Sequence, residues 1–144
     1  MDFFVLDEHI INDGFDPEAI SRAAAVRFVP TFSTIGACRG LYREALLIAA
    51  RAGVSVWAFV VAPKTGYLDE ETGDSLCELL SFADGIITAR QLALSLISPS
   101  GEMLDGECDE KEILKRLYGK FGLTFALLGD ASVGFDGESF SIIE

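Results

Sequence analysis

Few side chains in this sequence combine the types and spacing that chemistry requires, and the first group is Asp7-Glu8-His9. Carboxylates and imidazole are common metal ligands, but these three residues follow an apolar run, Phe3–Leu6, that predicts a strand. Neighbouring residues of a strand point to opposite faces, so the three side chains cannot all converge on one ion. We therefore interpret the group as a solvated strand end. His9 is the only histidine, which excludes mechanisms that need two.

The stretch TFSTIGACRG, residues 31–40, has the glycines and hydroxyls of a loop that could cradle phosphate. It lacks the Gly-Lys-Ser/Thr ending of a P-loop and the Gly-x-Gly-x-x-Gly spacing of a dinucleotide site. We therefore predict an ordinary strand-to-helix connection bracketed by Gly36 and Gly40. Cys38 could act as a nucleophile only beside a base, and the sequence around it offers none.

A third candidate is the loop APKTGY, residues 62–67, which follows the apolar run Val54–Val61. Lys64 could meet an anion there, because α/β sheets bind ligands at the carboxyl ends of their strands. A lone loop lysine is more often simply solvated. The acidic residues Asp69, Glu70 and Glu71 come next and head a predicted helix. Negative charge there complements the helix dipole, so we predict no metal site among them.

The elements that must position these residues alternate between strands and helices. Strands are predicted over Phe3–Leu6, Val26–Phe32, Val54–Val61, Asp84–Thr88 and Leu123–Leu128, with Pro30 marking an end or an edge. Helices are predicted from the Asp16-Pro17-Glu18 cap, over Leu41–Ala52, from Asp69 to Ala83, over Ala89–Ile97 and from Asp109 to Gly122. This order predicts an α/β domain spanning residues 1–144, with the last four strands parallel.

The apolar strands also carry a prediction about layers. A strand such as Val54–Val61, with almost no polar residue, is typical of a sheet covered on both faces. We therefore expect a three-layer α/β/α fold with a mostly parallel sheet, and we expect Trp57 in the core.

The C-terminal stretch Leu123–Ile143 predicts a buried strand, a turn at Gly129-Asp130 and a β-hairpin. The hairpin strands are Ser132–Phe135 and Ser139–Ile143, joined across Asp136-Gly137. Asp-Gly between two strand-like runs favours a type I′ turn, because both of its central residues need positive φ.

The composition excludes several classes of function. Eleven basic and twenty-three acidic residues give a net charge of −12, which repels phosphate backbones and anionic lipid. We therefore expect no nucleic-acid and no membrane partner, although a small nucleotide needs only a local anion site. The three cysteines are far apart and fit neither a disulfide framework nor a zinc site. The first residues lack a basic signal-peptide region, so we expect a cytoplasmic protein.

Three segments resemble the ribokinase-like (PfkB-type) carbohydrate kinases. They read GLYREALLIAARAGVSVWAFVV (40–61), LCELLSFADGIITARQLAL (76–94) and ILKRLYGKFGLTFALLGDASVGFDGESFSII (113–143). The resemblance covers Val26–Ile143 and is nearest to kinases of the 2-keto-3-deoxygluconate type. It implies ATP and Mg²⁺ as cofactors and a sugar or sugar acid as substrate. It places the nucleotide at Gly129, Asp130 and Gly134, and the sugar at Lys64 and Thr65.

The sequence also departs from that family. Its Asn-x-x-Glu motif, which orders magnesium and phosphate, corresponds here to Ala89-Arg90-Gln91-Leu92, and Leu127 stands where the family usually has threonine. The polar residues around the family's sugar-side strand end are missing from Ala58 to Pro63. The family's double-glycine sugar segment and Gly-Ala-Gly-Asp segment have no counterpart. We therefore predict no catalytic residue and no metal ligand, and no phosphate transfer by this chain alone.

Two functional hypotheses follow, with a third left open. The chain is part of, or a shortened relative of, an ATP-dependent sugar kinase, or it is a non-catalytic binding or interaction module on the same scaffold. An unrelated small α/β protein with another ligand stays open, because a fold does not fix a function. On the resemblance, uncovered sheet surface would make the chain prone to self-association.

Overall fold

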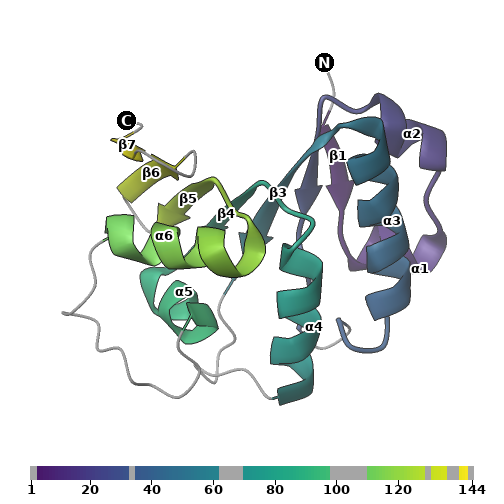
Figure 1. Ribbon diagram of the computed structural model, residues 1–144. Coiled ribbons are helices and arrows are strands. Elements are labelled where there is room, and N and C mark those ends of the chain that lie inside the picture. The colour runs from purple at the N-terminus through teal and green to yellow at the C-terminus, as the bar shows by residue number, and fades with distance from the viewer. Residues whose placement is uncertain are drawn as a thin grey trace.

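The computed structural model of the chain describes residues 3–32, 35–61, 70–97, 110–128, 131–135 and 140–142. Seven strands form one sheet in which the spatial order follows the chain order (Figure 1). The strands are β1 (Phe3–Leu6), β2 (Ala25–Phe28), β3 (Ser55–Val60), β4 (Gly85–Thr88), β5 (Phe125–Leu128), β6 (Ala131–Phe135) and β7 (Phe140–Ile142).

Strands β1 to β5 are all parallel, which confirms the α/β class and the predicted parallel pairing. Strand β2 ends at Phe28, two residues before Pro30, and not at Phe32 as predicted. Strands β6 and β7 then pair antiparallel with β5 and with each other. Each parallel step requires a crossover, and the helices provide it.

The described helices are α1 (Glu8–Asp13), α2 (Pro17–Arg22), α3 (Arg39–Ala52), α4 (Glu70–Leu80), α5 (Arg90–Ile97) and α6 (Glu110–Phe121). The predicted helix cap at Asp16 is confirmed, because its Oδ1 accepts a hydrogen bond from the Glu18 N–H at 3.0 Å. Gly53 and Gly122 follow α3 and α6 in the left-handed region, with φ of 73° and 79°. No helix in the described ranges is long and apolar enough to cross a bilayer.

Helix α1 corrects the prediction of a solvated strand end at Asp7-Glu8-His9. Asp7 caps the helix, because its Oδ1 accepts a hydrogen bond from the Ile10 N–H at 3.1 Å. Ile11 is buried on the inner side of the helix. Asp7 is a residue type that caps helices, but it stands directly after a strand, where the same residue types also form turns.

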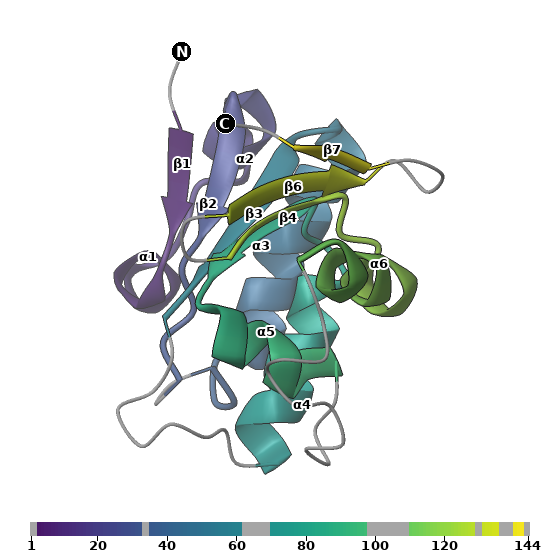
Figure 2. The same cartoon turned by 90° about the vertical axis from the view of Figure 1, so that its left-hand side faces the viewer.

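Helices α3, α4 and α6 gather on one face of the sheet, with α2 against α3 and α5 against α6, whereas α1 contacts the edge strand β1 (Figure 2). This follows from handedness: parallel crossovers are right-handed, so strands added always in the same direction place their helices on the same side. No described helix covers the other face at β3, β4 and β5. The described residues therefore form two of the three expected layers.

The core lies between the helices and one face of the sheet. Val56, Ala58 and Val60 of β3 are buried, whereas Trp57 and Phe59 between them are only partly buried. The same alternation occurs in β5. The expectation that Trp57 is a core residue was therefore wrong, because its side chain lies on the face without helices.

The predicted C-terminal hairpin is confirmed, because β6 and β7 pair antiparallel, with Phe135↔Phe140 as the last described pair. Strand β6 also pairs antiparallel with β5, where Leu128 lies opposite Ala131. The predicted turns at Gly129-Asp130 and Asp136-Gly137 lie between these pairs. Residues 129–130 and 136–139 themselves lie outside the described ranges.

Candidate functional site

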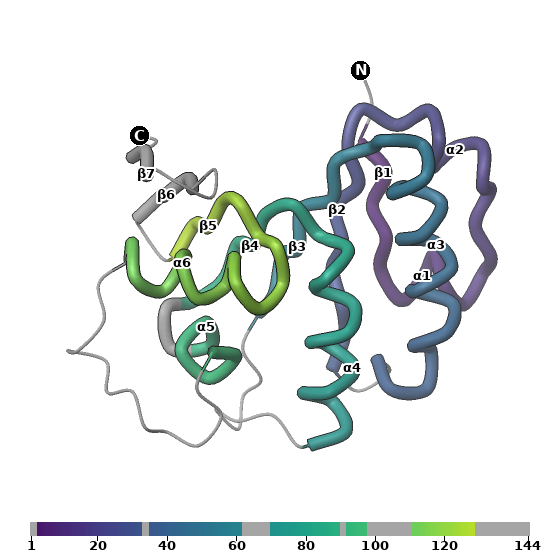
Figure 3. The backbone as a smooth tube through the Cα atoms, in the orientation of Figure 1, coloured from purple at the N-terminus to yellow at the C-terminus, as the bar shows by residue number. Residues whose placement is uncertain are grey.

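The candidate site lies at the carboxyl edge of the parallel strands. Helices α3 and α4 each come after a strand, so their first turns stand at this edge, side by side (Figure 3). Open α/β sheets bind their ligands outside the carboxyl ends of the strands, because the loops and the positive ends of the helix dipoles meet there. The first turns of α3 and α4 are therefore the place to look for a ligand.

An open cavity of about 540 Å³ lies between these two helix starts. We call it the edge groove, and its lining residues are Arg39 of α3 and Glu70, Glu71 and Asp74 of α4. The connection before α3 contributes backbone, because a Cβ added to Gly36 would stand 2.9 Å from Glu71 Oε1. The predicted strand-to-helix connection at Gly36 is confirmed, and Gly40 falls in the first turn of α3.

Arg39 is held in place by Glu78, one turn after Asp74 along α4. Its Nε contacts Glu78 Oε2, while Arg43 NH1 lies 3.7 Å from Glu78 Oε1. Glu78 is thus shared by two arginines, and both arginine side chains keep substantial exposure, 41% and 58%. Arg39 keeps donors to spare, since a guanidinium carries five N–H groups.

The charges of the edge groove limit its ligand. Three carboxylates and one guanidinium line it among the residues that the structure describes, so a polyanion such as a triphosphate would meet net repulsion from them. A ligand rich in hydroxyl groups fits better: hydroxyls donate to carboxylates and accept from arginine. The arrangement can therefore orient a polyol without any charge on the polyol itself.

The described residues do not supply a metal centre of the kinase type. No three His, Cys, Asp or Glu side chains within the described ranges converge as ligands. Ala89, beside β4, offers no side-chain oxygen, and the Thr88 hydroxyl before it donates to the Val60 carbonyl at 2.7 Å. Where the family's motif would hold Mg²⁺, Ala89 and Leu92 therefore do not fit the ion.

Cys77 lies behind the edge groove, on α4 between Asp74 and Glu78. Burial raises the pKa of its thiol, nearby Lys120 opposes that rise, and Asp74 adds to it. A thiol with a raised pKa is a poor nucleophile at neutral pH, so we assign Cys77 no chemistry. Cys38 precedes α3, and its Sγ lies 3.9 Å from Asn12 Oδ1.

Of the five site residues predicted from the sequence, the structure describes only Gly134. Lys64, Thr65, Gly129 and Asp130 lie outside the described ranges. Gly134 is inside β6, paired with Phe125 at the amino end of β5. The nucleotide and sugar roles of these five residues stay predictions.

Sequence reasoning missed Arg39 and Asp74, and it treated Glu70 and Glu71 only as a helix head. The sequence carries one signal for these residues, namely their position: helices α3 and α4 each follow a strand of one parallel sheet. That signal does not say which two helix starts are neighbours, because this depends on the strand order.

No protein-family model and no curated protein matches the chain. The solved structures that are similar in fold include the following two. A PfkB protein from Polaromonas sp. JS666 matches with a TM-score of 0.64 and 18% identity, over 90% of this chain and 42% of that one. An adenosine kinase from Sinorhizobium meliloti matches with a TM-score of 0.56 and 17% identity, over 91% of this chain and 38% of that one.

This chain thus spans less than half the length of either kinase. At such identity the likeness concerns the arrangement of strands and helices. The chain has the α/β fold of a part of these kinases.

Proposed function

We propose that this chain is a carbohydrate-kinase-type α/β unit that binds a sugar in the edge groove and does not transfer phosphate by itself. The observation that carries the proposal is the groove: Arg39 and three carboxylates stand at the carboxyl edge of a sheet whose fold is that of PfkB-type kinases. The cytoplasmic location expected from the cysteines and from the first residues agrees with this role.

Turnover is not expected, because phosphoryl transfer needs the nucleotide, a metal and the acceptor hydroxyl held in line. The family's metal motif corresponds to Ala89-Arg90-Gln91-Leu92, and none of the described residues replaces it. ATP contact at Gly129, Asp130 and Gly134 remains part of the proposal, with Mg²⁺ held by the nucleotide and not by this chain.

The charge of the edge groove bears on the substrate class. A sugar acid would set its carboxylate against three others, and among the described lining residues Arg39 alone could pair with it. We therefore expect neutral sugars to bind better than sugar acids of the 2-keto-3-deoxygluconate type.

Calorimetric titration with a panel of neutral sugars and sugar acids tests the proposal, together with ADP release in the presence of ATP and Mg²⁺. We expect weak sugar binding and no sugar-dependent ADP release. Arg39→Ala should abolish the binding. The matched control is Arg116→Ala, which removes an arginine that pairs with Glu112 at 3.0 Å on α6, away from the groove.

Two results would refute it. Sugar binding that survives Arg39→Ala places the ligand elsewhere. Sugar-dependent ADP release lost on Asp130→Ala would show that the chain is a kinase on its own.

The second candidate, a non-catalytic interaction module, is favoured by a different observation, the sheet face that no described helix covers.

A further inference from the structure

We draw no further inference here: the strongest candidate, the apolar sheet face around Trp57 and Phe59 on the side of the sheet opposite helices α3, α4 and α6, carries none, because nothing in the structure shows what covers it.

Discussion

The indole ring of Trp57 lies against Gly85 on the neighbouring strand, so closely that a Cβ on Gly85 would stand 2.8 Å from the ring carbons Cε3 and Cζ3. The same Cβ would lie 3.4 Å from the Phe125 Cβ. Glycine is therefore required at this position for lack of space and not for its backbone freedom, since Gly85 is not among the glycines with positive φ.

Gly85→Ala should lower the free energy of unfolding by about 1–3 kcal/mol, because the ring must leave its place or the strands must separate. Urea unfolding measures it. Gly119→Ala in α6 is the control: nothing lies within 4 Å of its added Cβ, so it should gain up to about 1 kcal/mol from helix propensity. A neutral Gly85→Ala would show that Trp57 moves aside freely.

Asp84 joins three strands at the amino edge of the sheet. Its Oδ2 accepts from the Val56 N–H at 2.8 Å, its own N–H donates to the Val56 carbonyl at 2.8 Å, and its carbonyl accepts from the Thr124 N–H at 2.9 Å. Asp84→Ala removes the acceptor of a buried N–H and should cost about 1–2 kcal/mol in urea unfolding. Asp84→Asn keeps an oxygen there and should cost less; equal losses would mean that the charge, and not the acceptor, matters.

The cap of α1 is a third test. Asp7→Ala leaves the Ile10 N–H without its side-chain acceptor and should cost about 1 kcal/mol of stability, measured by thermal unfolding. Asp13→Ala, at the other end of α1, removes a negative charge from the negative end of the dipole and should be neutral or slightly stabilising. The reverse ranking would contradict the assignment of α1 as a helix capped by Asp7.

The Cys77 thiol should titrate above its ordinary pKa of 9.0, because burial disfavours the thiolate. The pH dependence of alkylation in a Cys38→Ser, Cys108→Ser background measures it. Lys120→Met should raise the pKa of Cys77 further and Asp74→Asn should lower it, since these neighbours act in opposite directions. Shifts of the same sign in both variants would exclude this electrostatic origin.

The raised pKa of Cys77 also predicts the sign of a pH effect on stability. The folded state holds the proton more tightly than the unfolded state does. The stability that this proton contributes is therefore complete below the unfolded pKa, near 9, and is lost as the pH rises through the folded value.

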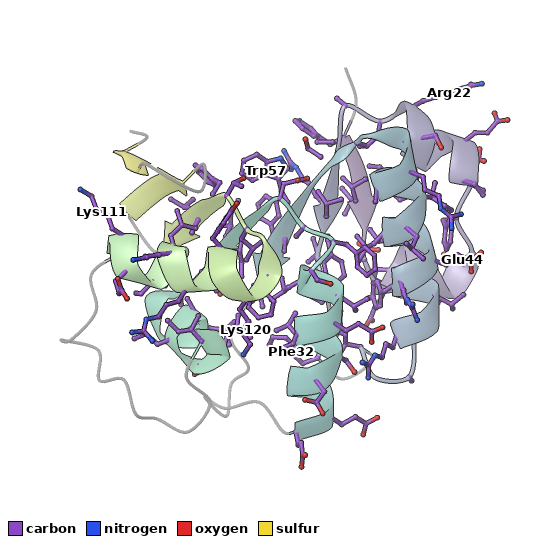
Figure 4. The ribbon with its side chains drawn as sticks, viewed as in Figure 1. Arg22, Phe32, Glu44, Trp57, Lys111 and Lys120 are labelled. Carbon is purple, nitrogen blue, oxygen red and sulfur yellow. The ribbon has the colours of Figure 1, made fainter. Side chains whose placement is uncertain are left out.

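Lys120 should also contribute to stability apart from its effect on the pKa of Cys77. Its Nζ donates a hydrogen bond to the Leu96 carbonyl at 2.5 Å and so joins α6 to the last turn of α5 (Figure 4).

The sequence by itself determined the local structure. Apolar runs separated by amphipathic segments predicted five strands and the parallel pairing of the last four, and Asp16 and Gly53 marked where helices begin and end. These signals are reliable because they act within a few residues: a cap satisfies its own helix, and a run of β-branched and aromatic residues favours extended backbone whatever lies around it. The helix cap at Asp7 could not be predicted in this way, because the residue types that cap helices also end strands.

The tertiary structure alone decided which residues meet and which faces are covered. Arg39 and Asp74 line one groove because β2 and β3 are neighbours in the sheet, a fact that no local pattern contains. Trp57 and Val56 look equally suited to a core, yet only Val56 is fully buried, because right-handed crossovers in one direction put helices α3, α4 and α6 on the side of Val56. Hydrophobicity shows that a side chain needs cover, whereas the path of the chain decides which side chains receive it.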